Sequence, residues 1–182
     1  MGMKAFRIDN IPDLRGRILD VGGGGECIIG RFFGNRVIAI DNRQEELDEA
    51  PDVCEKRVMD AAFLCFDAET FDTITFFYSL MYMDLDTQKQ AMKEAARVLK
   101  YKGNLYVWDT DISSAFPEPY VVQLEIPIGP ETIHTAYGIV KKDLQNSNSI
   151  TAVALSSGLR LQETRKEEGH FCLHFAKGER SL

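Results

Sequence analysis

The chain has 182 residues, of which 45% are hydrophobic and 27% are charged, and these values are ordinary for one soluble globular domain, residues 1–182. Its formal net charge of −7 argues against tight, sequence-independent binding to nucleic acid. No apolar run reaches the roughly 20 residues of a membrane span, and the four cysteines form no C-x-x-C pair, so we expect a cytoplasmic protein with reduced thiols.

The first predicted strand, residues 17–21, leads into the most informative stretch of the chain. The strand carries Asp20 near its end, and four consecutive glycines follow, residues 22–25. Glycine reaches backbone conformations that other residues resist, and four in a row cost ordering entropy, so a purely structural turn rarely uses so many. The pattern is typical of a nucleotide-cradling loop after a parallel strand. The alternative is an ordinary tight turn between a strand and a helix.

Further strands are predicted where apolar, aromatic and β-branched residues cluster, at residues 37–41, 56–60, 71–80 and 105–108. The first two of these end in an aspartate, Asp41 and Asp60, like the strand before the glycines. The spacing between the glycines and Asp41 suits a carboxylate that is brought to the same crevice as the loop.

Helices are predicted between these strands. A short helix follows the glycines, Asn42 is expected to cap the next helix, and Asp86 is expected to cap a longer one. Residues 101–104 are expected to stop the longer helix. Apolar residues recur along it at the spacing of a buried helix face, namely Ala91, Ala95, Val98 and Leu99. Strands that alternate with helices in this way indicate a parallel sheet with helices on both faces.

The last third of the chain changes character. Two strands, residues 120–126 and 132–140, are predicted within an insertion, residues 111–142, which forms a lid or a β-hairpin beside the sheet. A further helix is predicted to begin at Ser147 or Ser149 and to finish at residue 158.

Two final strands, residues 159–164 and 171–176, are joined by a connection too short for a parallel crossover, so they are predicted to form an antiparallel hairpin. The predicted fold class is therefore α/β. We expect a Rossmann-like, mostly parallel seven-stranded sheet with helices on both faces, an antiparallel C-terminal hairpin and a small β insertion after the fifth strand.

Taken in order, five segments between about residues 17 and 176 resemble the class I S-adenosylmethionine-dependent methyltransferases of small-molecule type. The segments are residues 18–25, 37–41, 60–72, 71–83 and 94–103. The resemblance implies S-adenosyl-L-methionine as the cofactor and a small molecule as the methyl acceptor. The cofactor-binding residues that it implies are Asp20, Gly22, Gly23, Gly24, Asp41, Asn42, Asp60, Ala61 and Tyr78.

The resemblance also implies roles for the three strand-end aspartates. Asp20 orients loop amides or the cofactor's ammonium group, Asp41 binds the ribose hydroxyls, and Asp60 reads adenine together with the amide of Ala61. The residues alone leave other roles open, because an aspartate at a strand end also fixes turns or caps the following helix. Glu26 departs from the family, since it stands where the loop's third glycine commonly lies. We expect its side chain to point outward as the first acid of a helix.

Catalytic residues are harder to predict, because methyl transfer mainly requires two partners held in line, and a base only when the nucleophile carries a proton. The candidates are Tyr78, Tyr82 and His134. A tyrosine offers its ring face to a positive charge or its hydroxyl to a nucleophile, but tyrosines in such positions also serve as core residues. His134 lies in the insertion, where a solvent-facing strand histidine is the alternative.

We expect no metal. Asp109 and Asp111 follow the fifth strand and superficially suggest a metal pair, but Tyr78 and Ser79 stand where a further ligand would be needed. The expected partner is a small-molecule acceptor, with neither a membrane nor nucleic acid, and a homodimer is left open.

The sequence thus predicts a methyltransferase, with two alternatives from other classes. One is a cofactor-binding regulator or catalytically silent subunit, because fold does not fix function. The other is an NAD(P)-dependent oxidoreductase, since Gly22 and Gly24 satisfy the first two glycines of the dinucleotide fingerprint, while Cys27 occupies the position of the third.

Overall fold

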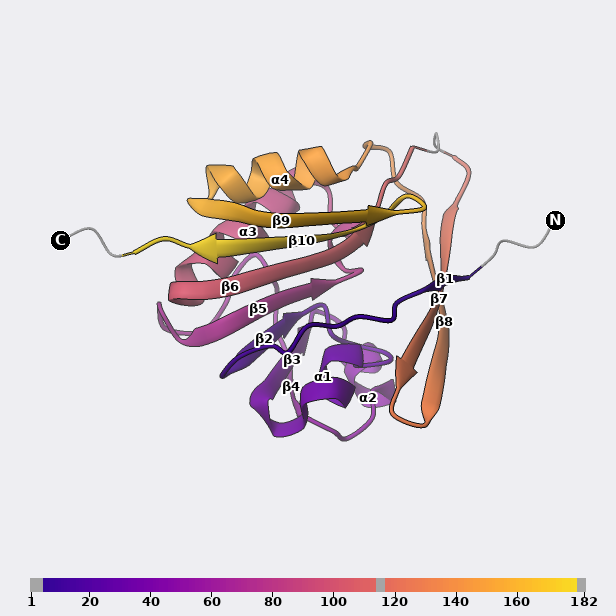
Figure 1. Cartoon of the computed structure of the whole chain (residues 1–182), viewed down its shortest axis with the longest axis horizontal. Helices are drawn as coiled ribbons and strands as arrows, with labels where there is room; N and C mark the ends of the chain where they lie inside the picture. Colours follow the sequence, from indigo (N-terminus) through magenta and orange to yellow (C-terminus); the bar gives the residue numbers. More distant parts are fainter. Residues whose placement is uncertain (1–4, 114–116, 180–182) are drawn as a thin grey trace.

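A seven-stranded sheet forms the centre of the computed structural model, which describes residues 5–113 and 117–179 (Figure 1). The strands are β2 (Ile18–Val21), β3 (Val37–Asp41), β4 (Glu55–Val58), β5 (Phe71–Phe77), β6 (Leu99–Thr110), β9 (Leu159–Glu167) and β10 (His170–Lys177). Their order across the sheet is β4-β3-β2-β5-β6-β10-β9. The first five strands in this order pair in parallel, and β10 is antiparallel to both of its neighbours. The predicted fold class is confirmed.

Helices cover both faces of this sheet. The helices are α1 (Ile28–Phe33), α2 (Gln44–Glu49), α3 (Leu85–Val98) and α4 (Ser147–Ser156), with short 3-10 turns η1 (Gly34–Arg36) and η2 (Leu80–Tyr82). α3 and α4 pack behind β6, β10 and β9, and α1 packs on β3 and β5 (Figure 1). Each face has its own apolar core, one built around Met92 of α3 and the other around Ile29 of α1. None of the helices among the described residues is long and apolar enough to cross a membrane.

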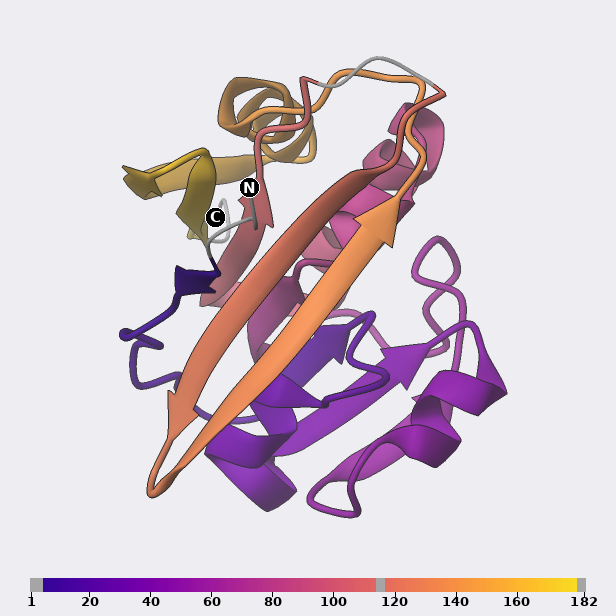
Figure 2. The same ribbon diagram turned by 90° about the vertical axis from the view of Figure 1, so that its right-hand side faces the viewer.

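A second, smaller sheet consists of β1 (Phe6–Arg7), β7 (Tyr120–Ile128) and β8 (Glu131–Ile139), with β7 in the middle. β7 and β8 form an antiparallel hairpin, and the short β1, which the sequence did not predict, runs parallel to β7. The hairpin lies across the ends to which the parallel strands point (Figures 1 and 2). Val122, Leu124 and Ile126 anchor it in the core on the α1 side. Within the predicted insertion, residues 114–116 lie outside the described residues.

Several predicted helix ends are wrong. Asp84 rather than Asp86 caps α3, because the Asp84 carboxylate accepts a hydrogen bond of 2.8 Å from the Thr87 amide. Asn42 does not cap α2, whose N-cap is Arg43 without a side-chain hydrogen bond. α3 already ends at Val98, because Leu99 adopts extended backbone and begins β6, so residues 101–104 do not stop the helix.

The helix α4 begins at Ser147, one of the two predicted starts. Its cap is Asn146, whose side chain accepts from the Ser149 amide while the Ser149 hydroxyl accepts from the Asn146 amide. This reciprocal capping box satisfies two donors at the helix start, so the serine at the third position reinforces the cap rather than forming it.

Candidate functional site

A cavity of about 730 Å³ lies between the glycine loop, the ends of β3 and β5, and the β7–β8 hairpin. We call it the loop cavity. It is lined by all nine residues predicted to bind the cofactor, which are Asp20, Gly22, Gly23, Gly24, Asp41, Asn42, Asp60, Ala61 and Tyr78. They come from four separate stretches of the chain, which the parallel strands bring to one edge of the sheet. The volume lies within the about 300–1,000 Å³ typical of small-molecule sites.

The glycine loop packs so tightly that side chains are excluded from it. A Cβ on Gly23 would lie 2.4 Å from an Asp20 carboxylate oxygen, and one on Gly24 would lie 2.8 Å from an Asp41 carboxylate oxygen. Gly22 has a φ of +75°, a conformation that favours glycine, and a Cβ there would meet Ser79 at 2.5 Å. Because these glycines have no side chains, the carboxylates of Asp20 and Asp41 can approach the loop. The backbone of the loop therefore faces the cavity.

Asp20 is the most deeply buried acid of the loop cavity, with 1% of its surface exposed. Its carboxylate accepts a hydrogen bond of 2.7 Å from the Thr75 hydroxyl. Burial raises the pKa of Asp20 to about 7, the Thr75 hydrogen bond opposes the shift, and the charge of Asp41 adds to it. Asp20 therefore changes charge near neutral pH, and a nearby cation would favour its ionised form.

Asp41 and Asp60 each have a local structural contact as well as a place in the cavity wall. The Asp41 carboxylate accepts a hydrogen bond of 3.0 Å from the Arg43 amide at the start of α2. The Asp60 carboxylate accepts one of 2.8 Å from the Ala62 amide in the turn after β4. Turn formation and ligand binding are compatible here, because each carboxylate has a second oxygen.

The lining of the loop cavity is strongly acidic. One cation, Arg43, faces seven carboxylates, which are those of Asp20, Glu26, Asp41, Glu46, Glu49, Asp60 and Asp84. Arg43 is itself paired with Glu46. Such a field attracts a positively charged ligand and repels phosphates.

The prediction that Glu26 points outward is wrong. Its carboxylate accepts hydrogen bonds from the hydroxyls of Thr135 and, at 3.4 Å, Tyr137, both on β8. Glu26 therefore ties the end of the glycine loop to the hairpin, and it lines the loop cavity together with Tyr137. The sequence signal for this contact was the acid at the position where a glycine is usual. The sequence did not indicate the partners of Glu26, because they are more than a hundred residues away in the chain.

Of the candidate catalytic residues, Tyr78 and Tyr82 line the loop cavity and His134 does not. Tyr78 follows β5 with a φ of 49°, and its hydroxyl is joined to Nδ1 of His170 by a hydrogen bond of 2.7 Å. Tyr82 closes η2 and is half-exposed. His134 is exposed on β8, with Nδ1 3.7 Å from the carboxylate of Glu125.

Asp109 has a structural role in the turn after β5. Its buried carboxylate accepts hydrogen bonds from the amides of Met81 and Thr110 and from the side chain of Gln145. Burial raises its pKa to about 7 against these hydrogen bonds. Within residues 5–113 and 117–179, no three acidic, histidine or cysteine side chains gather in a way that could hold a metal ion.

One contact that the sequence did not indicate lies under the glycine loop. The sulfur atoms of Cys27 and Cys54 are 3.3 Å apart, and both lie beside Gly30 of α1. Cys27 is buried at the start of α1, with a left-handed φ of 50°. The two thiols are separated by 27 residues, so no local motif announces the pair.

Comparison with protein families and curated proteins gives one family match. Residues 19–107 match the family model described as a methyltransferase domain. This matched segment contains the glycine loop, all three strand-end aspartates and most of β6. No curated protein matches the sequence.

Solved structures with the same fold include an S-adenosylmethionine-dependent methyltransferase from Methanosarcina mazei. It is 19% identical, with a TM-score of 0.68 over 95% of this chain and 100% of that chain. A methyltransferase of the same kind from Clostridium acetobutylicum is 16% identical, with a TM-score of 0.62 over 90% of this chain and 85% of that one. The [4+2]-cyclase SpnF is 17% identical, with a TM-score of 0.64 over 91% of this chain and 76% of that one.

Proposed function

We propose that the chain is a class I S-adenosylmethionine-dependent methyltransferase, and that it transfers a methyl group from S-adenosyl-L-methionine to a small-molecule acceptor. The match of residues 19–107 to a methyltransferase domain and the fold shared with such enzymes support the proposal. The observation that carries the proposal is the convergence of the glycine loop and three strand-end aspartates on one acidic cavity. S-adenosylmethionine carries a sulfonium and an ammonium, so a surplus of carboxylates suits it.

The residues present fit this cofactor. We assign the ribose hydroxyls to Asp41, whose carboxylate lies against Gly24, and the adenine to Asp60 with the Ala61 amide. Asp20 and the backbone of the glycine loop would hold the methionine part. The free carboxylate oxygen of Asp41 and the absence of a Cβ at Gly24 support this placement, since they leave room for a charge-assisted hydrogen bond to a ligand.

When bound, the cofactor supplies an activated methyl group on a sulfonium. The contribution of the protein is to bind, to orient and to exclude water, because an in-line displacement needs accurate placement more than proton transfer. Tyr78 and Tyr82 line the loop cavity, and a tyrosine ring face beside the sulfonium would stabilise its positive charge. The hairpin covers this edge through Ala136 and Tyr137, which supports an acceptor that is small.

The first experiment is calorimetric titration of the purified protein with S-adenosylmethionine, S-adenosylhomocysteine and NAD. We expect both adenosyl ligands to bind and NAD to give no heat of binding. Binding of NAD alone would favour the oxidoreductase alternative. Absence of adenosyl binding in a protein shown to be folded by circular dichroism would refute the proposal.

A methyl-transfer assay separates an enzyme from a silent cofactor-binding protein. The fold alone does not decide between these two, because a structure named as a [4+2]-cyclase has the same fold. With methyl-labelled cofactor and a panel of small acceptors, an enzyme transfers label to at least one class. Robust binding without transfer to any class would favour a regulator.

The four thiols, all free among the described residues, support the cytoplasmic location that we propose.

A further inference from the structure

Two cysteine thiols face each other beneath the glycine loop. The sulfur of Cys27 lies 3.3 Å from that of Cys54, although 27 residues separate them in the chain. A disulfide bond joins sulfurs at about 2.05 Å, so these two need to approach each other by about 1.2 Å from their 3.3 Å contact. Where such a pair is oxidised in a reducing compartment, the disulfide is usually transient and serves catalysis or redox sensing.

Gly30 of α1 provides the space in which the two sulfurs meet. A Cβ at this position would lie 2.5 Å from the Cys27 sulfur and 2.7 Å from the Cys54 sulfur. Alanine is ordinarily favoured over glycine inside a helix. The glycine therefore lowers the intrinsic stability of α1 and at the same time allows the two thiols to stay in contact, which supports a role for the pair beyond packing.

The two thiols differ in exposure and in acidity. Cys27 is 1% exposed, whereas Cys54 is partly exposed in the segment that leads into β4. A hydrogen bond from Cys27 lowers the pKa of Cys54 against the effect of partial burial, and the charge of Lys56 also lowers it. The same hydrogen bond, together with burial, raises the pKa of Cys27. Cys54 is therefore the thiol that ionises first and that a small oxidant reaches.

Cys27 connects the pair to the loop cavity. It lines that cavity, and a single residue, Glu26, separates it from the glycine loop. Its backbone has a left-handed φ of 50°, and its carbonyl oxygen accepts a hydrogen bond from the Arg31 amide at the start of α1. The glycine loop is tightly packed, because a Cβ on Gly23 would lie 2.4 Å from Asp20. A pull on the Cys27 side chain therefore displaces the backbone that faces the cavity.

We propose that Cys27 and Cys54 form a reversible, peroxide-sensitive disulfide that weakens cofactor binding in the loop cavity. The bond would join the start of α1 to the segment between α2 and β4. Ile28 of α1 and Glu49 of α2 both line the cavity, so the bond would link two of its walls. Formation of the disulfide depends only on the two thiols, whereas its effect on the cofactor rests on the proposed function.

The oxidation balances with a hydroperoxide as the oxidant. The Cys54 thiolate attacks one oxygen of hydrogen peroxide, the O–O bond breaks, and a sulfenic acid and hydroxide form. The hydroxide combines with the proton that Cys54 has lost and gives water. The Cys27 sulfur then attacks the sulfenic sulfur, the S–O bond breaks, and the oxygen leaves with the Cys27 proton as a second water. Two thiols are oxidised to one disulfide, one peroxide is reduced to two waters, and a dithiol reductant reverses the change by thiol–disulfide exchange.

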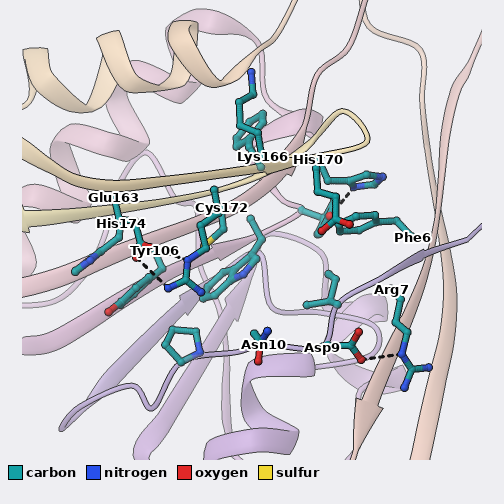
Figure 3. A pocket seen from close by; sticks show the side chains of 17 residues that line it. Phe6, Arg7, Asp9, Asn10, Tyr106, Glu163, Lys166, His170, Cys172 and His174 are labelled. Atoms are coloured by element: carbon teal, nitrogen blue, oxygen red, sulfur yellow. Dashed lines mark hydrogen bonds and ion pairs between the residues drawn. The ribbon is translucent and has the colours of Figure 1, made fainter.

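The two other thiols serve as internal controls. Cys65 is exposed in the segment between β4 and β5. Cys172 of β10 lies in the wall of a second cavity, of about 270 Å³, on the face of β6 and β10 (Figure 3). Burial raises the pKa of Cys172 to about 12, which slows its reaction with peroxide. Cys65 is accessible, so it distinguishes oxidation of the pair from general oxidation of exposed thiols.

The first experiment treats the full chain and two variants, Cys54→Ser and Cys65→Ser, with hydrogen peroxide. Cys54 does not line the loop cavity, and serine keeps an acceptor for the Cys27 thiol. Peptide mapping under non-reducing conditions should find a cross-linked Cys27–Cys54 peptide in the original chain and in Cys65→Ser, and dithiothreitol should remove it. Absence of this peptide from the peroxide-treated original chain would overturn the proposal.

The second experiment measures S-adenosylhomocysteine binding by calorimetry before and after oxidation. We expect oxidation to weaken binding about fivefold or more in the original chain and in Cys65→Ser, and dithiothreitol to restore it. Cys54→Ser should bind equally well before and after peroxide. A disulfide without any change in affinity, or equal weakening in Cys54→Ser, would refute the coupling to the site.

The two experiments separate failure of this inference from failure of the proposed function. If the reduced, folded chain does not bind S-adenosylhomocysteine, the proposed function fails and the effect on binding fails with it. The peptide map still reports whether the two thiols form a disulfide. If the reduced chain binds the ligand and peroxide changes neither the map nor the affinity, only the inference about the cysteine pair is wrong.

Discussion

Thr135 of the hairpin donates a hydrogen bond to Glu26 at the end of the glycine loop, although 109 residues separate them in the chain. The contact joins the β7–β8 hairpin to the glycine loop, and both of them line the loop cavity. A hydrogen bond to a charged group contributes about 1.5–3 kcal/mol, enough to influence how often the hairpin opens locally.

Replacement of Thr135 should therefore loosen the hairpin. In Thr135→Val we expect faster amide hydrogen exchange across residues 131–139, because the Glu26 carboxylate loses a donor at nearly constant side-chain volume. Thr132→Val is the matched control, since Thr132 is exposed on the same strand. Equal exchange in the two variants would show that Thr135 does not hold the hairpin in place.

Asp41 should be needed for cofactor binding. Asp41→Ala is expected to weaken S-adenosylmethionine binding by about 1–3 kcal/mol, through loss of charge-assisted hydrogen bonds, as measured by calorimetry. Asp48→Ala on α2 is the control, because Asp48 contacts Gln44 and does not line the loop cavity. An unchanged affinity in folded Asp41→Ala would remove the ribose assignment.

Asp60 should contribute less than Asp41, because its side chain is exposed and one oxygen is committed to the turn. Asp60→Ala is expected to weaken binding by about 1 kcal/mol. The matched control is Asp67→Ala, an exposed acid outside the cavity lining. If binding in Asp60→Ala equals that of the unmodified protein, adenine recognition lies elsewhere.

Asp20 should make cofactor binding depend on pH. Its pKa is raised to about 7, so below that value the acid is neutral, and a bound cation must first ionise it. Affinity for S-adenosylmethionine is therefore expected to rise about tenfold between about pH 5.5 and pH 7.5. Asp20→Asn should flatten the profile while it keeps an acceptor for Thr75. An equally steep profile in this variant would assign the dependence to another group or to the ligand.

Gly30 should resist substitution although it lies inside a helix, where alanine is ordinarily favoured by about 1 kcal/mol. A Cβ there would lie 2.5 Å from the sulfur of Cys27 and 2.7 Å from that of Cys54. Overpacking of this kind costs about 1–3 kcal/mol, so we expect Gly30→Ala to lower the free energy of unfolding in urea. Gly138→Ala is the control, because its Cβ would meet only an ordinary contact at 3.9 Å. Increased stability in Gly30→Ala would contradict the packing.

Much of the loop cavity could be predicted from the sequence because its residues stand at the ends of strands. Strand periodicity, the glycine run and the aspartates at 20, 41 and 60 are local signals, and parallel pairing brings such ends to one edge of the sheet. Helix caps were predicted less well, since Asp84 and Asp86 are both good capping residues. Which of these two residues caps α3 depends on the position and direction of the chain at the end of the preceding turn, η2.

By itself the sequence determined the α/β class, the order of the elements and the acids that face the glycine loop. The tertiary structure alone decided the contacts that surround the loop cavity. Tyr78 meets His170 across 92 residues, Glu26 meets the hairpin, and Cys27 meets Cys54. The reason is physical: a strand's alternation says which side chains share a face, but not which distant strand or hairpin lies opposite. That pairing is settled only when the whole chain packs.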